Sequence, residues 1–218
     1  MTMRVGIVGG TGDIGEGLAM RLSSRHDVVI GSRDEARAVT SSQCCLTTLR
    51  QRGLPCSCEG TTNQQAVDRS DIVILAVPFS HVAGTVSGLR GLSGKIVVSP
   101  VNPIEKRDYF MYVPPPEGSA AMMIRNLLPA DARLCTAFNT VAANKWRALD
   151  QELHLAVPVC GDDRDAKATV MELVNSIEGI RAYDAGPLAA SCMVESLTPL
   201  LLNIARFNRM RDVGIEFR

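Results

Sequence analysis

Three glycines near the start of the chain have the types and the spacing that bind a dinucleotide. Gly10, Gly12 and Gly15 match the pattern G-x-G-x-x-G, and an apolar run at residues 5–8 comes directly before them. In this pattern the first glycine permits a tight turn, the second lets the backbone approach a pyrophosphate, and the third lets a helix pack closely on a strand. The phosphates bind free N–H groups at the start of that helix. We therefore predict a nucleotide-binding turn, against the alternative of a glycine-rich turn that binds nothing.

A serine and two arginines after the next apolar run indicate which dinucleotide binds. A site for NAD usually has Asp or Glu about 20 residues after the glycines, where it accepts a hydrogen bond from the ribose 2′-OH. This chain has Ser32 and Arg33 there, with Arg37 one helical turn further on. A guanidinium and a hydroxyl can hold a 2′-phosphate, which a carboxylate would repel. The sequence therefore predicts NADP; the alternative is that both arginines are solvated charges at the exposed start of a helix.

Alternating strand and helix patterns predict the elements that position these residues. After the strand and helix at residues 4–24, strands are expected at residues 28–30, 56–59, 71–77, 95–98, 134–137, 156–159 and 180–183, and helices lie between them. This alternation with short connections is typical of an α/β fold with a doubly wound (Rossmann) parallel sheet. Residues 1–150 are expected to form an NADP-binding domain, and residues 151–218 a smaller C-terminal helical and α/β part.

The composition argues against several other classes of protein. The 218 residues are 46% hydrophobic, with 23 basic and 23 acidic residues. This is enough apolar material for a large core, without the basic excess of a protein that binds nucleic acid or a membrane surface. No apolar run reaches the length of about 18 residues that predicts a transmembrane helix, and the first strand starts too early to leave room for a signal peptide. We expect a cytoplasmic protein.

The seven cysteines do not have the spacing of a metal site. Cys44 and Cys45 are adjacent, Cys56 and Cys58 are closer together than the usual zinc-binding pair, and no histidine lies near them in the sequence. We predict reduced thiols that serve as small apolar side chains, and no bound metal.

Two segments depart from the regular alternation. Residues 99–118 contain five prolines and no helical period, which predicts a long ordered loop or lid. Ser119 is then expected to cap the following helix. Residues 191–210 are predicted to form a long apolar helix, interrupted at Pro199. This helix is either a core helix or a surface that packs against a second subunit.

The loops after the strands should form the site, because ligands of doubly wound sheets lie outside the carboxyl ends of the strands. These loops are residues 9–14, 31–33, 77–81, 99–103, 138–143 and, more remotely, 160–163. We expect the nicotinamide end of the nucleotide near Val77, Pro78, Asn102 and residues 139–143, which include Val141.

Several segments spread over nearly the whole chain occur together in one known family. They are GGTGDIG at residues 9–15, GSR at 31–33, IVVSP at 96–100, VPVCGDD at 157–163, DAGPL at 184–188, VESLTPL at 194–200, NI at 203–204 and RFN at 206–208. Together they resemble coenzyme F420-dependent NADP oxidoreductase. The run ESLTPL is the most specific of them.

The resemblance implies reversible hydride transfer between NADPH and the 5-deazaflavin of coenzyme F420, in a cytosolic homodimer. The deazaflavin would stack on the nicotinamide in the cleft between the main domain and the C-terminal part. By the same resemblance, the nucleotide contacts are Thr11, Gly12, Asp13 and Ile14 at the pyrophosphate, Ser32, Arg33 and Arg37 at the 2′-phosphate, and Val77, Asn102 and Ala143 at the nicotinamide end.

Hydride transfer asks little of the side chains, since the protein mainly has to hold two rings together and exclude water. We assign no catalytic acid, base or nucleophile. Ser80, His81 and Asn139 are candidates for stabilising negative charge on the deazaflavin. For His81 we favour the alternative of an ordinary surface or capping histidine.

Two other functions stay open at this point. The chain could be another NADPH-dependent reductase of related build, acting on an imine, a ketone, a flavin or ferric iron. It could also be a non-catalytic NADP sensor. An F420-dependent enzyme should bleach the deazaflavin absorbance, whereas a sensor should bind NADP without reducing an acceptor. The predicted lid favours an enzyme.

Overall fold

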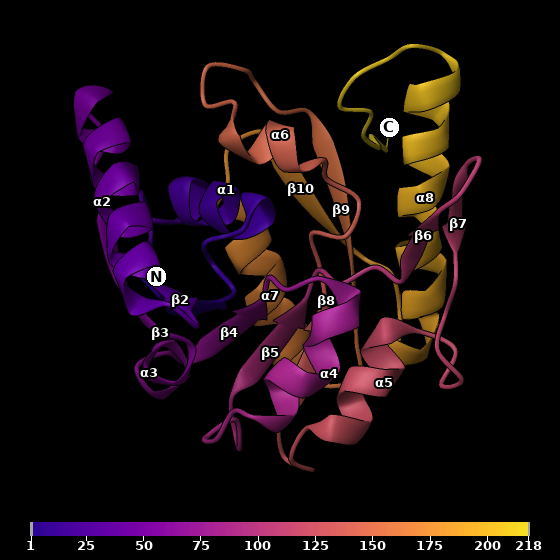
Figure 1. Ribbon diagram of the computed structural model, residues 1–218, viewed down its shortest axis with the longest axis horizontal. Helices are drawn as coiled ribbons and strands as arrows, with labels where there is room; N and C mark the ends of the chain where they lie inside the picture. Colours follow the sequence, from indigo (N-terminus) through magenta and orange to yellow (C-terminus); the bar gives the residue numbers. More distant parts are fainter. Residues whose placement is uncertain (1, 218) are drawn as a thin grey trace.

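An eight-stranded sheet runs through the centre of the molecule and has helices on both faces (Figure 1). The computed structural model describes residues 2–217. The strand order is β10-β9-β8-β5-β4-β1-β2-β3. The strands are β1 (Arg4–Val8), β2 (Asp27–Ser32), β3 (Ser57–Thr62), β4 (Ile72–Leu75), β5 (Ile96–Ser99), β8 (Arg133–Thr136), β9 (Leu155–Gly161) and β10 (Ile180–Asp184).

The helices divide between the two faces, which confirms the doubly wound α/β fold. One face carries α1, α2, α6 and α7, and the other carries α3, α4, α5 and the short 3-10 helix η1. The long helix α8 follows η1 and contacts α5 and the strand β7 (Phe110–Tyr112). The helices are α1 (Asp13–Leu22), α2 (Glu35–Gln51), α3 (Asn63–Asp68), α4 (Phe79–Ser87), α5 (Ala120–Leu127), α6 (Ala143–Arg147), α7 (Arg164–Asn175), η1 (Leu188–Ala190) and α8 (Ser191–Phe207).

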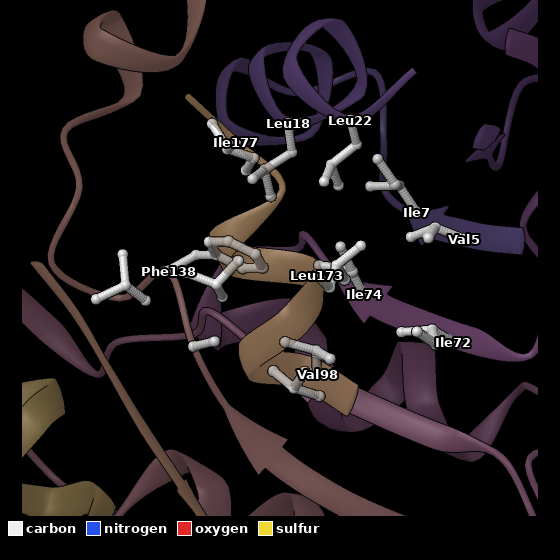
Figure 2. Packing of buried hydrophobic residues seen from close by; sticks show 14 of the residues in the cluster. Val5, Ile7, Leu18, Leu22, Ile72, Ile74, Val98, Phe138, Leu173 and Ile177 are labelled. Carbon is white, nitrogen blue, oxygen red and sulfur yellow. The ribbon is translucent and has the colours of Figure 1, made fainter. Parts of the chain in front are cut away.

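Successive residues of each strand point to opposite faces of the sheet and so build two cores. Along β4, Ile72 and Ile74 belong to the core under α1 and α7, whereas Val73 and Leu75 belong to the core on the other face. Figure 2 shows the first of these cores, with side chains of α1 and α7 packed over the strands. Apolar packing on both faces therefore holds the strands in place. The loops that are expected to form the site follow directly after these strands.

The pairing of β8 with β9 is antiparallel, with Cys135 opposite Gly161 and Thr136 opposite Cys160. The sheet is therefore mostly parallel, and the parallel pairing expected from the alternation of strands and helices is not found at this pair. A parallel pair needs a connection that crosses back to the starting edge of the sheet. Residues 137–154 instead hold only the short helix α6, which packs on α1. Strand β9 thus starts at the edge where β8 ends, and residues 160–163 lie at the edge opposite to the glycine-rich turn.

Residues 99–118 are more regular than the predicted long loop. They contain a two-stranded antiparallel hairpin, β6 (Ile104–Lys106) and β7 (Phe110–Tyr112), with Ile104 opposite Tyr112 and Lys106 opposite Phe110. Each strand is only three residues long, so the flanking prolines hid the pattern from sequence analysis.

Polar side chains of α8 tie it to segments far away in the sequence, and α8 lies alongside the hairpin (Figure 1). The Asn203 amide pairs with both backbone groups of Phe110, at 2.8 Å each. The Thr198 hydroxyl donates to the carbonyl of Asn139 at 2.8 Å. By length and composition the stretch Leu188–Phe207, with a mean hydropathy of 1.5, could also cross a membrane. This is weak evidence, because the core helix of a soluble protein passes the same test.

Candidate functional site

The glycine-rich turn between β1 and α1 has the geometry of a nucleotide-binding turn. Gly9 takes a left-handed backbone with a φ of 72°, which glycine adopts at little cost. The Gly10 N–H donates to the carbonyls of Ile7 at 3.1 Å and Gly31 at 2.8 Å, which closes the turn against β2. The residue that needs a special backbone is therefore Gly9, and not Gly10 as the pattern suggested. Gly10 is required for space, since a Cβ there would lie 2.8 Å from the Ile7 carbonyl oxygen.

The start of α1 fits an anionic pyrophosphate. Gly12 is the N-cap of the helix and supplies no side chain to its first N–H groups, so a ligand can reach them. A Cβ on Gly12 would have only the Gly9 carbonyl oxygen, at 3.6 Å, in its vicinity. A Cβ on Gly15, in contrast, would lie 2.5 Å from the Gly10 Cα. Gly15 is therefore closely packed against the turn, whereas Gly12 leaves open space where the pyrophosphate is expected.

Two acids in the first turn of α1 would oppose a phosphate if they stood alone. Arg147 of α6 forms an ion pair with Asp13 at 3.0 Å and a second one with Glu16. Glu16 also accepts a hydrogen bond from the Ser41 hydroxyl at 2.8 Å. The guanidinium offsets the carboxylate charge beside the helix start. Sequence analysis missed Arg147, because 131 residues separate it from Glu16.

The two arginines after β2 stand beside a groove. Arg33 and Arg37 are exposed, and neither forms an ion pair within residues 2–217. Ser32 is buried, and its Oγ lies 3.5 Å from the Thr11 Oγ1 while it accepts from the Asp34 N–H at 3.2 Å. The groove has a volume of about 320 Å³ and is lined by Gly9, Thr11, Gly12, Ser32, Arg33, Asp34, Arg37, Asn63, Ala76, Val77, Pro78, His81 and Thr85. A 2′-phosphate and a pyrophosphate can therefore be held at two places along one groove.

A second hollow of about 560 Å³ shares several walls with this groove. Ser80 and His81, at the start of α4, line it together with Ser32 and Arg33. Sequence analysis named these two side chains as candidates for stabilising charge on the deazaflavin, and for His81 it favoured an ordinary surface or capping histidine. The structure brings them to the same hollow as Arg33, which is the predicted 2′-phosphate ligand.

The segments predicted for the nicotinamide end are joined by hydrogen bonds. The Asn102 Nδ2 donates to the Asn139 carbonyl at 3.0 Å, and the Asn139 Nδ2 donates to the Asn102 Oδ1 at 3.1 Å and to the Val101 carbonyl at 3.2 Å. Asn139 is only 3% exposed, so its amide orients the loop. Its neighbour Phe138 has a φ of 69°, which is unusual for an aromatic residue.

The other residues predicted at this end lie around that loop. Val141 is buried beneath it, and Ala143 is the first residue of α6. Val77 and Pro78 line the groove that starts at Gly9. Within residues 2–217, no three His, Cys, Asp or Glu side chains gather in a way that could hold a metal ion.

A buried carboxylate ties the C-terminal helix α8 to the start of α5. Glu195 of α8 is fully buried and accepts from the N–H groups of Ala120 at 2.8 Å and Ala121 at 2.9 Å, and from the Tyr112 hydroxyl at 3.2 Å. Burial raises the pKa of the Glu195 carboxyl above its ordinary value, against the lowering effect of these donors. Ser119 caps the same helix start, as predicted, by accepting from the Met122 N–H. Glu195 therefore joins α8, α5 and the hairpin.

The fold and the site together define an NADP-type dinucleotide-binding protein. The family model for "NADP oxidoreductase coenzyme F420-dependent" matches residues 4–103. The F420-dependent NADP reductase of Methanocaldococcus jannaschii is 36% identical over 98% of this chain and 97% of its own length. The enzyme of the same name from Methanothermobacter marburgensis is 33% identical, with the same coverage. The chain therefore belongs to the family of F420-dependent NADP reductases.

A solved structure from Arthrobacter sp. FB24 has the same fold. Its TM-score is 0.81 over 99% of both chains, at 20% sequence identity. The sheet with its two helical layers is thus shared at a level of similarity where few side chains are the same.

Proposed function

We propose that this chain transfers a hydride reversibly between NADP(H) and coenzyme F420. The observation that carries the nucleotide half is the pair of exposed arginines, Arg33 and Arg37, beside a groove that begins at the start of α1. Family membership supports the F420 half. When bound, the two cofactors supply the chemistry, because nicotinamide and deazaflavin each give and accept a hydride.

The residues of this chain bind and orient the nucleotide. We assign the pyrophosphate to the N–H groups of residues 11–14, and the 2′-phosphate to Ser32, Arg33 and Arg37. The placement of Ser80 and His81 beside Arg33 supports a role for them on this side of the nucleotide. The nicotinamide end is assigned to Val77, Pro78, Asn102, Val141 and Ala143.

Catalysis then depends on position and on exclusion of water. The Asn102 and Asn139 amides hold the two nicotinamide-side loops against each other. Thr198 fixes the same loop to α8, and Asn203 fixes the hairpin to α8. We propose that residues 151–218, with this helix, complete the deazaflavin cleft.

We further propose that α8 forms the contact of a cytoplasmic homodimer. Met193, Leu200, Ile204 and Phe207 are exposed by 69%, 53%, 37% and 67%. Their spacing of seven, four and three residues places them on one face of the helix. A soluble protein rarely leaves such a face uncovered. A second copy of this chain covers it with the same residues, as two-fold symmetry requires.

The test of the activity is a spectrophotometric assay of the purified protein with NADPH and oxidised F420. We expect bleaching of the deazaflavin band with NADPH, and little with NADH. With FMN in place of F420 we expect no turnover. Absence of F420 reduction by a protein that binds NADPH would overturn the proposal in favour of another NADPH-dependent reductase or a sensor.

A further inference from the structure

Asn63, the first residue of α3, touches both loops that build the nucleotide groove. Its Oδ1 accepts a hydrogen bond from the Gly9 N–H at 3.0 Å. Its Cα and Oδ1 also lie 3.0 Å from where a Cβ on Gly31 would be. Gly9 is the residue with the left-handed backbone. One side chain therefore holds the turn after β1 next to the end of β2.

The hydrogen bond to Gly9 fixes which way the Asn63 amide faces. A backbone N–H can only donate, so the atom opposite it is the amide oxygen. The amide nitrogen then points along the other branch of the planar group. Within residues 2–217 this nitrogen has no protein partner, and Asn63 lines both the groove at the glycine turn and the hollow beside Ser80. Two N–H donors thus remain available where the nucleotide is expected.

The position of Asn63 in the groove indicates the part of the nucleotide that these donors meet. Thr11 and Gly12 lie toward the pyrophosphate, and Ser32 and Arg33 lie toward the 2′-phosphate. Asn63 belongs to the walls shared by these two places. Between its pyrophosphate and its 2′-phosphate, a nucleotide bound there presents ribose and phosphate oxygens, and each of these can accept a hydrogen bond.

We propose that Asn63 is an NADP-binding residue that donates from its amide nitrogen to an oxygen of the adenosine half, while its amide oxygen holds Gly9. This inference rests on the NADP half of the proposed function and not on F420. It gives α3 a part in cofactor binding for which no sequence motif provides a signal.

The test is the substitution Asn63→Asp, with dissociation constants measured by calorimetry for NADPH and for 2′,5′-ADP. The aspartate keeps an acceptor for the Gly9 N–H and loses the donor, but it also adds a negative charge. We expect both ligands to bind about fivefold more weakly, the effect of losing one hydrogen bond. The melting temperature of the ligand-free protein should change little. Variant and parent are compared at the same salt, in 0.05 M and in 0.5 M NaCl. Salt screens the repulsion of the added charge, so the difference that remains in 0.5 M NaCl reports mainly the lost donor.

Asn126→Asp is the matched control, because it makes the same change at an exposed position of α5 and should leave both constants unchanged. If Asn63→Asp binds both ligands within twofold of the parent in 0.5 M NaCl, the donor role is wrong and Asn63 only supports Gly9. A loss for NADPH without a loss for 2′,5′-ADP would overturn the assignment to the adenosine half.

Asn63→Ala serves if the aspartate variant does not fold. It removes donor and acceptor together without adding charge, and unchanged binding would again contradict the proposal. A parent protein that fails to bind NADPH would refute the proposed function itself, and one that binds NADPH without reducing F420 would leave this test intact.

Discussion

The glycine-rich turn and the α8 region each fix loops of the molecule, and they do so by different means. At the turn, the Gly10 N–H bonds to the Ile7 carbonyl three residues earlier, and backbone N–H groups of Gly9 and Gly10 also reach Asn63 of α3 and Gly31 of β2. At α8, side chains reach across the sequence: Glu195 is 75 residues from Ala120, and Asn203 is 93 residues from Phe110. The glycines of the first arrangement can be read from a local pattern, whereas the side-chain bonds of the second exist only in the folded chain.

Among substitutions that remove the contacts of α8, Glu195→Ala should have the largest effect on stability. Two buried N–H groups at the start of α5 would lose their acceptor, so we expect a loss of about 4 kcal/mol in the free energy of unfolding. Urea unfolding followed by circular dichroism measures it. Glu172→Ala, at an exposed position of α7, is the control and should cost little. A loss below about 1 kcal/mol would show that the first turn of α5 finds water instead.

The charge of Glu195 adds a pH dependence to this stability. Burial raises the carboxyl pKa in the folded protein above the ordinary 4.5. A raised folded-state pKa contributes stability that is fully present below the unfolded pKa and is lost as pH rises through the folded value. The stability advantage of the parent over Glu195→Gln should therefore be larger at pH 5 than at pH 8. An advantage that does not change between these pH values would mean that the carboxyl ionises as it does in water.

The exposed face of α8 can be tested with Leu200→Glu. Each dimer would carry the new charge twice, because the interface is symmetric. We expect the dissociation constant of the dimer to rise at least about 100-fold, which corresponds to roughly 3 kcal/mol. Sedimentation velocity over a range of concentrations measures it. Val39→Glu changes an exposed apolar residue of α2 and should leave assembly unchanged. A Leu200→Glu variant that remains as dimeric as the parent would exclude this face as the contact.

At the nucleotide groove, Arg33→Ala should weaken the binding of NADPH by roughly 2 kcal/mol, the value of a charge-assisted pair with the 2′-phosphate. NADH lacks that phosphate, and its affinity should hardly change. Fluorescence titration of both nucleotides gives the two constants. Arg25→Ala, at an exposed position after α1, provides the control. Equal losses for NADPH and NADH would remove Arg33 from the 2′-phosphate site.

Local rules of the sequence predicted most of the fold, and the residues proposed for the pyrophosphate and the 2′-phosphate lie along one groove. The alternation of apolar runs gave every strand of the large sheet to within a few residues, because burial on both faces requires such runs. The glycine pattern and the two arginines located the groove. These signals succeed because each one depends on neighbours along the chain.

The predictions that failed involve relations between distant segments. The direction of β9 depends on how residues 137–154 pack on α1, which no local pattern encodes. Asn63 and Arg147 have no motif of their own, and their importance comes from Gly9, Asp13 and Glu16 beside them. The run ESLTPL at residues 195–200 indicated a family resemblance, but the sequence did not show what its side chains bind. In the structure its Glu195 and Thr198 hold neighbouring loops by hydrogen bonds to backbone groups.

The smallest expected effect comes from Ser119→Ala. This substitution acts at the start of α5, where a neighbouring serine and a carboxylate from a distant helix both bind backbone N–H groups. Ser119 caps α5 locally through the Met122 N–H at 3.0 Å, while Glu195 caps the same turn from α8. Loss of the serine cap should cost about 1 kcal/mol in urea unfolding, and Ser119→Thr should retain most of it. The double variant with Glu195→Ala should lose less than the sum of both, because a first turn that has already unwound leaves fewer N–H groups to cap. Additive losses would mean that the local cap and the distant carboxylate stabilise α5 independently.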